Sequence, residues 1–420
     1  MEPARARRRR GAGGRRRIAR RLPLALLLVI LAAVWAAGFY LLWQTDVPSG
    51  LDLPDVEARA LLGAAELDEA REYERFLRLD FLLAELTVLL VFGLYARYGH
   101  RFTRESAAGR IGTGMLLAML GFALLWLAQL PFGLVGLWWE RRHDVSEQDY
   151  GTWIFESWVG LGGAFLFVCL AILIVMGLAG PLPNHWWIPG GAVFVGLTVL
   201  FSFVLPYMLP NQIPLRDSEL LADAEGFARE QGLGEAPPVR VQEVREFTTA
   251  PNALAAGFGP SQRVILWDTL LDGRFGDEEI RVVLAHELGH VSRDHIWKLV
   301  GWYALFAFPG AFLIARATRR RGGMRKAESV PLALFVLVGL SLLALPLQNA
   351  FTRHLEAEAD WIALETTRDP EAARALFRRF GTTALADPSP PTWSYVLMET
   401  HPTLAERVAM VEAWEGRRRG

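Results

Sequence analysis

The sequence is poor in cysteine: Cys169 is the only one among 420 residues, and it lies inside a long apolar stretch. A single cysteine cannot form a disulfide within the chain, and it excludes a structural zinc site built from several thiolates. Any metal ion held by this chain must therefore be bound by histidine and carboxylate side chains.

Charged residues are nearly absent from long parts of the chain. Hydrophobic residues make up 52% of the sequence, above the roughly 45–50% that is usual in soluble proteins. They gather in seven stretches, each near the roughly 20 residues that cross a bilayer as a helix: 24–43, 81–95, 114–137, 159–179, 186–209, 296–315 and 331–347. The second and seventh are short enough to be re-entrant or core helices instead. The sequence thus predicts a mostly α-helical, polytopic membrane protein with about seven transmembrane helices.

The N-terminus carries a strong local charge. Although the formal net charge is −1, ten arginines fall within the first 21 residues. We interpret residues 1–22 as a basic cytoplasmic tail before a membrane helix, and a nucleic-acid-binding arm is the less favoured alternative. The helix that follows is expected to remain as an anchor, although a cleaved signal peptide is also open.

Polar segments divide the rest of the chain. Residues 23–209 are expected to form an N-terminal membrane region of about five helices, and residues 296–350 two further membrane helices. Between them, residues 210–295 have the pattern of a small α/β catalytic module, with a polar helix at 218–231 and strand-like runs at 239–244 and 263–267. Residues 351–420 are expected to form a C-terminal helical segment.

One motif carries recognisable chemistry, the segment LAHELGHV with His286, Glu287 and His290. Its helix is expected to begin near Gly276, with Asp277 as the cap. Residues four apart share a helix face, so the two imidazoles can bind one metal ion. The glutamate between them can take a proton from an activated water. A chance match is expected in roughly one chain in a hundred of this composition.

A third ligand is expected downstream, because a catalytic zinc needs three protein ligands and an open position. Glu356 and Asp360 follow the last apolar stretch and lie four apart on one helix face. One of them can bind the metal while the other orients a histidine or the water. Glu358 is expected to face elsewhere. A solvated acidic helix is the alternative for this segment.

Several short motifs occur in the second half of the chain: HELGH; RxxExxAD, formed by Arg353, Glu356, Ala359 and Asp360; His295; NALAAG at 252–257 before the strand VILW at 264–267; and HPTL at 401–404 with Arg407. Together they resemble the type I CAAX prenyl protease family and its HtpX-like relatives. The resemblance is strong from residue 211 onward and weak before it.

This resemblance implies a membrane-embedded zinc metalloendopeptidase of the gluzincin type, with a zincin-like catalytic module. One Zn²⁺ would be bound by His286, His290 and Glu356, with Glu287 as the base. Asp360 would be a proton donor or a partner of a metal ligand. CAAX-box protein processing is the activity that the resemblance implies.

The resemblance also implies a substrate site. His401 would stand near the oxyanion, and Asn252 with Ala253 on the edge strand that receives the substrate backbone. For His401 and Asn252 a capping or turn role is the alternative. The expected partners are a peptide or membrane-protein substrate, with or without a lipid modification, and the lipid bilayer, but no nucleic acid. The expected location is the plasma membrane of a bacterium.

The sequence patterns disagree on which side of the membrane the site faces. The basic tail, residues 97–110 and residues 316–326 favour a cytoplasmic N-terminus, and seven spans then put HELGH outside. The resemblance instead suggests a site that faces the cytoplasm. Glu356 shares the side of HELGH in either case, because two spans separate them.

Three other functions use similar features. An intramembrane protease of the site-two type also has this motif, but here the motif begins outside any apolar stretch. An HtpX-like protease that degrades misfolded membrane proteins fits the same residues. A seven-helix transporter or receptor with an incidental metal site would not need a free carboxylate such as Glu287 beside its metal.

Overall fold

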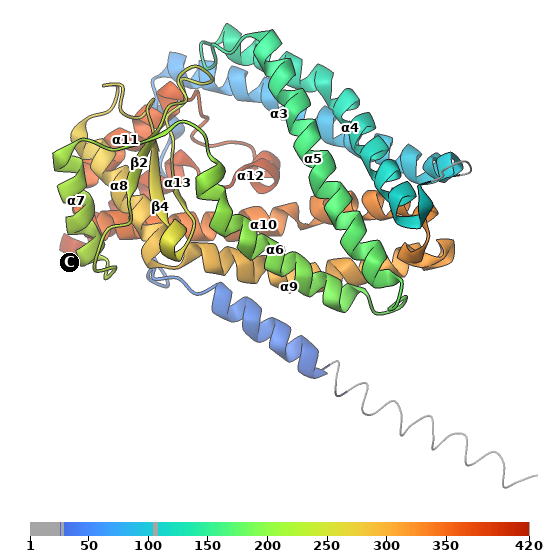
Figure 1. Ribbon diagram of the computed structural model, residues 1–420. Helices are drawn as coiled ribbons and strands as arrows, with labels where there is room; N and C mark the ends of the chain where they lie inside the picture. Colours follow the sequence, from blue (N-terminus) through green and yellow to red (C-terminus); the bar gives the residue numbers. More distant parts are fainter. Residues whose placement is uncertain (1–25, 27–28, 104–107, 420) are drawn as a thin grey trace, which may run out of the picture.

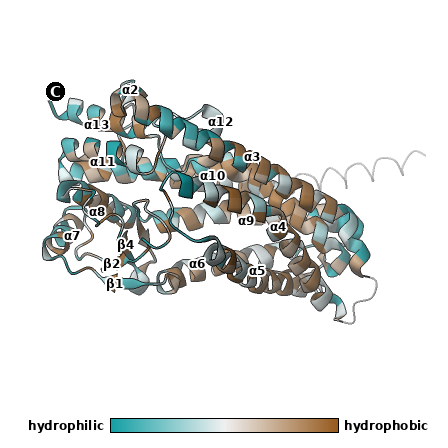
Figure 2. Ribbon diagram, turned by 90° about the horizontal axis from the view of Figure 1, so that it is seen from above, coloured by the Kyte–Doolittle hydropathy of each residue, from teal (hydrophilic) through white to brown (hydrophobic). Residues whose placement is uncertain are grey.

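The computed structural model describes residues 26, 29–103 and 108–419, which form a long helical bundle with a smaller mixed module at one end (Figure 1). After the short helix α2 (Ala58–Leu61), the bundle contains α3 (Ala64–Tyr98), α4 (Gly109–Arg142), α5 (Tyr150–Ala179), α6 (Trp187–Met208), α9 (His295–Thr318) and α10 (Val330–Thr367). The helices outside the bundle are α7 (Ser218–Glu230), α8 (Asp277–Ser292), α11 (Pro370–Thr383), α12 (Thr392–Met398) and α13 (Leu404–Arg419). Figure 2 shows that hydrophobic residues dominate the bundle and hydrophilic ones the module.

Six helices within the described residues are long and apolar enough to cross a membrane. They correspond to six of the seven predicted stretches and confirm a polytopic, mostly α-helical protein. In the first stretch the segment Val29–Leu42 forms a shorter apolar helix, and residues 24, 25, 27 and 28 lie outside the described residues. The predicted number of about seven is thus slightly high for the part of the chain that the structure describes.

The two stretches that are short in the sequence belong to much longer helices. Residues 81–95 lie within α3, which has 35 residues, and residues 331–347 lie within α10, which has 38. The polar ends of both helices join the module, so neither stretch is re-entrant. Because α10 continues to Thr367 without a break, the last apolar stretch and the expected third ligand share one helix.

Small residues let the bundle helices approach closely. An added Cβ at Gly121 would lie 2.9 Å from the ring of Tyr95, and one at Gly191 would lie 2.7 Å from the ring of Phe308. The Tyr95 hydroxyl donates to the carbonyl of Leu117 at 2.6 Å, which satisfies a polar group inside an apolar bundle. Such close, small-residue contacts replace the hydrophobic effect as the source of helix packing in lipid.

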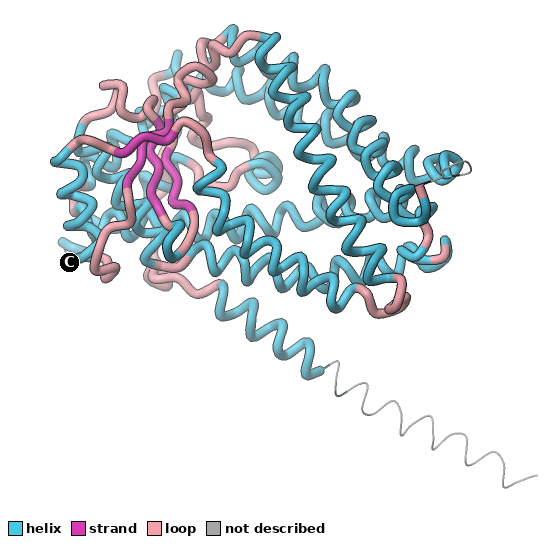
Figure 3. Tube along the Cα trace, viewed as in Figure 1, coloured by secondary structure: helices cyan, strands magenta, loops and turns pink. Residues whose placement is uncertain are grey.

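The module is built on a sheet, which Figure 3 shows among helices. Within the described residues it has four strands, in the order β1 (Gln212–Pro214), β2 (Val239–Gln242), β4 (Arg263–Trp267), β3 (Ala253–Ala256). Strands β2 and β4 are parallel, and β3 is antiparallel to β4. The strand expected at 263–267 is β4, and the run at 239–244 forms strand β2 only as far as Gln242. In the described part of the chain β3 pairs with β4 alone, which leaves its other edge free.

Helix α8 carries HELGH and packs against α10. Its N-cap is Gly276 rather than the expected Asp277, and the Gly276 amide donates to the Glu279 carboxylate at 2.7 Å. At Gly289 an added Cβ would lie 3.4 Å from the Cα of Ala359 on α10. A glycine costs stability inside a helix, and the Cβ that an alanine would add here still fits between α8 and α10.

Candidate metal centre

Three side chains from two helices bring ligand atoms together. His286 and His290 lie one turn apart on α8, and Glu356 lies on α10; their ligand atoms are all within 4.8 Å of one another. The two Nε2 atoms are 3.0 Å apart. The Glu356 Oε2 lies 3.2 Å from the Nε2 of His286 and 3.5 Å from that of His290. The three residues predicted as metal ligands therefore form one cluster.

This cluster has the chemistry of a metal site. The Nδ1 atoms of both histidines are engaged by other side chains, so both Nε2 atoms are available to face inward. The Glu356 Oε2 is buried and has no hydrogen-bond partner among the described residues, which is costly unless a cation lies beside it. Bonds of about 2.0–2.1 Å to a tetrahedral zinc place two nitrogens about 3.3 Å apart, close to the observed separation. The residues therefore fit a metal ion.

Asp360 holds His286 in place. Its Oδ1 accepts from the Nδ1 of His286 at 2.9 Å. The guanidinium of Arg407 on α13 donates to both carboxylate oxygens, at 2.8 and 2.6 Å. The bond to Nδ1 fixes the tautomer of the imidazole and leaves the lone pair of Nε2 for a metal.

His290 is held by a longer series of contacts. Asp294 adopts a left-handed backbone with φ of 54° between α8 and α9, and His295 begins α9. The Nδ1 atoms of His290 and His295 are 2.7 Å apart, and the Nε2 of His295 lies 3.0 Å from the Oε2 of Glu358. With the Nε2–H of His295 donating to the carboxylate, its Nδ1 accepts from His290.

The carboxylate of Glu358 is buried and fully engaged. Besides His295, it accepts from Lys298 Nζ at 2.7 Å and from the backbone amide of Asp46 at 2.7 Å. Glu358 does face away from the metal ligands, as expected, but it acts on one of them through His295. The contacts therefore link the segment after the first helix to the metal centre.

Glu287 is buried beside the ligands on α8. Burial raises its pKa above the ordinary value for a glutamate, although the two neighbouring imidazoles and an amide hydrogen bond from Ala255 oppose this. A raised pKa suits a carboxylate that has to take up a proton during a reaction. Glu287 and Ala255 of strand β3 line the same cavity.

A loop between α12 and α13 brings His401 to the cluster. Its Nε2 lies 3.3 Å from the Oε2 of Glu356, and 56% of its side chain is exposed. Arg353, one turn before Glu356 on α10, donates to the carbonyls of Tyr395 and Glu399 at 2.9 and 2.6 Å. One helix thus carries a ligand and also holds the loop that bears His401.

The three candidate metal ligands line a cavity of about 470 Å³ that strand β3 borders. Asn252 and Ala253 also line it, so the structure brings all the predicted site residues together. The Trp267 amide donates to the carbonyl of Asn252 at 3.0 Å. In the alternation of an antiparallel ladder, the carbonyls of Ala253 and Ala255 therefore point to the free edge. The side-chain oxygen of Asn252 accepts from the Ala253 amide at 2.9 Å.

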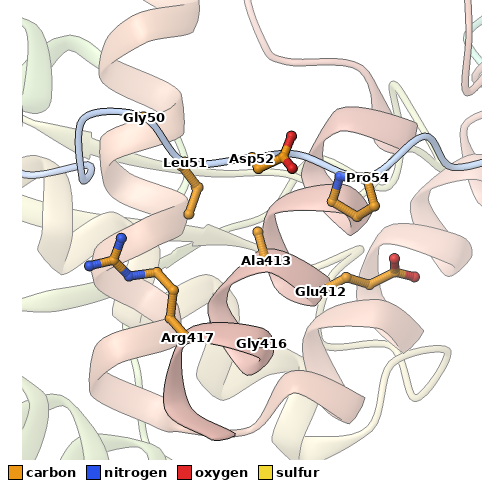
Figure 4. Close-up of a pocket in the computed structure, with 8 residues that line it drawn as sticks. All are labelled: Gly50, Leu51, Asp52, Pro54, Glu412, Ala413, Gly416 and Arg417. Atoms are coloured by element: carbon orange, nitrogen blue, oxygen red, sulfur yellow. The ribbon is translucent and has the colours of Figure 1, made fainter. Parts of the chain in front are cut away.

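A second hollow lies away from these residues. It is formed by the segment at 50–54 and by α13, with Leu51, Asp52 and Arg417 among its lining residues (Figure 4). None of the predicted site residues lines it. The cavity with the metal ligands is therefore the candidate site.

Comparison with known proteins agrees with this arrangement. The profile of peptidase family M48 matches residues 214–415. A protease HtpX homolog of Acidiphilium cryptum is 31% identical over 212 residues, which cover 45% of this chain and 71% of that protein. The chain belongs to peptidase family M48.

Two further relatives of this M48 peptidase match over more of its length. The metalloprotease YhfN of Bacillus subtilis is 24% identical over 93% of this chain and 96% of its own length. A CAAX prenyl protease 1 homolog of Oryza sativa is 25% identical over 70% of this chain and 73% of its own. The crystal structure of S. mikatae Ste24p is similar in fold, with a TM-score of 0.70 at 17% identity over 91% of this chain and 97% of that one.

This M48 peptidase is therefore a membrane-embedded metalloprotease. The side chains that make the polar contacts described above with His286, His290 and Glu356 lie within the family match, whereas Asp46, which bonds to Glu358, lies outside it. Family membership also removes the basis for a transporter or receptor with an incidental metal site.

Sequence reasoning did not find the part played by Glu358 and Lys298. Lys298 is one of two lysines in the chain and lies close to the start of an apolar stretch. A charged residue near such a stretch is a usable signal, because it normally has a partner. The signal could not name the partner, since Glu358 is 60 residues further along.

Proposed function

We propose that the chain is a zinc endopeptidase that cleaves peptides close to the surface of the bilayer, with one Zn²⁺ held by His286, His290 and Glu356. The observation that carries the proposal is the convergence of these three ligand atoms beside Glu287 and a free strand edge. When bound, zinc supplies Lewis acidity that makes water a nucleophile near neutral pH and polarises the peptide carbonyl.

The chain's own residues supply the proton transfers. Glu287 accepts a proton from the attacking water as its oxygen bonds to the scissile carbonyl carbon. The carbon–nitrogen bond then breaks, and Glu287 passes the proton to the leaving amine. His401 lies close enough to the cluster to donate a hydrogen bond to the oxyanion. One water molecule is consumed for each peptide bond that is hydrolysed.

Asp360 acts through His286 in this proposal. Both of its oxygens already accept hydrogen bonds from His286 and Arg407, which leaves it poorly placed to donate a proton. We therefore assign it the orienting role rather than that of proton donor.

Strand β3 receives the substrate backbone. The carbonyls of Ala253 and Ala255 face the cavity and can accept hydrogen bonds from an added strand. Asn252 stabilises the start of this edge through its bond to the Ala253 amide. An extended segment paired along β3 would pass over Glu287, which lines the same cavity as this strand.

The substrate is a peptide or a membrane protein, with or without a lipid modification. CAAX-box processing is supported by the motifs and by relatives named CAAX prenyl protease. Degradation of misfolded membrane proteins, as expected for an HtpX-like protease, is the alternative that the HtpX homologs support. The six apolar helices and the bacterial relatives support the plasma membrane of a bacterium as the location.

The test uses the full chain purified in detergent. We expect close to one zinc per chain, chelator-sensitive peptide cleavage, and a Glu287→Gln variant that keeps its zinc but loses at least about 100-fold in activity. Full activity in Glu287→Gln would disprove the mechanism. Three substrates are compared: a prenylated CAAX peptide, the same peptide without the lipid, and an unfolded membrane protein. Their cleavage rates distinguish CAAX-box processing from degradation of misfolded membrane proteins.

A further inference from the structure

The two ends of the helical bundle differ in charge. At the end far from the module, α3 connects to α4 and α9 connects to α10 (Figure 1). Residues 97–110 and 316–326, which make these connections, contain ten Arg or Lys residues and one acidic residue. We name the described residues of these two segments, 97–103, 108–110 and 316–326, the basic end. The bundle therefore has a strongly positive surface opposite the metal centre.

The structure joins the two segments into one surface. The guanidinium of Arg321 donates to the carbonyl of Ala96 at 2.6 Å, and that of Arg110 donates to the carbonyl of Arg325 at 3.4 Å. Arg319 and Arg320 are exposed. These contacts hold the positive charges together on one side of the apolar layer.

The connections at the module end carry more negative than positive charge. Residues 44–63 and 140–149 contain eight acidic residues and three basic ones. The first of these segments contacts the metal centre directly, because the Asp46 amide donates to Glu358. Hydrophilic residues thus border the bundle at both ends (Figure 2), but their charges differ in sign.

Short connections rich in Arg and Lys stay on the cytoplasmic side of a membrane. Each of the four connecting segments is much shorter than the roughly 60 residues above which this rule fails. Ten further arginines precede the helix Val29–Leu42, whose C-terminal end leads to Asp46 at the module end. Anionic lipids of the cytoplasmic leaflet attract such a surface, because their headgroups carry the opposite charge.

We propose that the basic end lies on the anionic headgroups of the cytoplasmic leaflet, so that the metal centre faces the extracytoplasmic side. This inference rests on the proposed function and narrows it: the substrates are exported peptides or extracytoplasmic segments of membrane proteins. It differs from the cytoplasm-facing site that the family resemblance suggests. It holds whether or not the first helix is removed, because the six long helices alone keep both segments of the basic end on one side.

Cysteine labelling in intact bacterial cells tests the orientation. In a Cys169→Ser background, Asp52→Cys and Arg320→Cys place single thiols at exposed positions at opposite ends. We expect a membrane-impermeant maleimide to label Asp52→Cys in intact cells, and Arg320→Cys only after permeabilisation. Labelling of both thiols only after permeabilisation, of Arg320→Cys alone, or of both in intact cells would overturn the proposal.

Charge replacement tests the role of the basic end. In the Arg320→Cys chain, combined Arg319→Glu and Arg325→Glu changes should make the thiol reachable from outside in a measurable fraction of molecules, whereas Arg319→Lys and Arg325→Lys should not. An unchanged orientation with the glutamates would overturn the headgroup contact. Labelling needs no proteolysis, so a Glu287→Gln version must give the same pattern, and failure of the protease mechanism remains distinguishable from failure of this inference.

Discussion

His290 and His295 face each other through their Nδ1 atoms at 2.7 Å, although they belong to different helices. The left-handed turn at Asp294 makes this possible, because it lets α9 begin beside the last turn of α8. His295 in turn lies 3.0 Å from the carboxylate of Glu358. His290, a candidate metal ligand, is thereby oriented by a histidine and a carboxylate in series rather than by a carboxylate alone.

His295→Ala should weaken metal binding by about 10–100-fold, the usual effect of removing the partner of a ligating histidine. Competition with a chelator at fixed pH measures it. His354→Ala is the matched control, because His354 lies on α10 but bonds to the Trp43 carbonyl at 2.8 Å instead of to a ligand. Equal affinities in the two variants would show that His295 does not support His290.

Glu356→Ala should abolish stoichiometric zinc in the purified protein, because two histidines alone make an incomplete site. Glu365→Ala is the control on the same helix, where the carboxylate accepts from the indole of Trp414 at 2.7 Å. Metal analysis of both variants is the measurement. Normal zinc content in Glu356→Ala would mean that another residue is the third ligand.

Arg407→Met should destabilise the protein by about 3–5 kcal/mol, since it leaves the buried Asp360 carboxylate without its cation. Adding Asp360→Asn should restore part of the lost thermal stability but none of the activity, because His286 still lacks its anionic partner. Melting in detergent and peptide cleavage are measured on the single and double variants. Simple additivity of the two stability losses would contradict a direct pair.

Gly289→Ala should be tolerated and should stabilise α8 by up to about 1 kcal/mol, since the added Cβ meets Ala359 at an ordinary contact distance of 3.4 Å. Gly289→Leu should push α8 from α10 and lower zinc content. Gly226→Leu on α7 is the control, because nothing lies within 4 Å of a Cβ there. Full zinc occupancy in Gly289→Leu would show that zinc binding does not depend on the close packing of α8 against α10.

Arg353→Met should release the loop that bears His401 and lower kcat by about 10-fold, while zinc content stays unchanged. Loss of one oxyanion donor costs about 100- to 1,000-fold, so His401→Ala should have the larger effect. In the His401→Ala background, Arg353→Met should cause no further loss. A further loss of equal size would mean that Arg353 acts on something other than His401.

Local spacing was sufficient for part of the site. Two histidines four apart on a helix must share a face, and the same holds for Glu356 and Asp360, so these pairs are readable from the sequence. The spacing did not decide which carboxylate binds the metal. That depends on how α8 crosses α10 at Gly289 and Ala359, a contact between elements 70 residues apart.

The apolar stretches likewise predicted the fold except at their ends. Hydropathy marks only the part of a helix that lies in lipid, so residues 81–95 and 331–347 appear short. The helices themselves continue as polar segments because they pack on the module there. The cap at Gly276 was missed for a different reason: glycine has no side chain with which to cap the first turn, and the bond that marks this end runs from its amide to the Glu279 carboxylate.

The continuity of α10 also determines how far from the bilayer a substrate must extend to be cleaved. Glu356 lies nine residues beyond Leu347, the end of the apolar stretch, and a rise of about 1.5 Å per residue puts it at most about 14 Å further along the axis. An extended chain covers that height in about four residues. A substrate tethered in the bilayer thus needs a spacer of about that length between its anchor and its scissile bond, and a shorter one holds the bond below the metal.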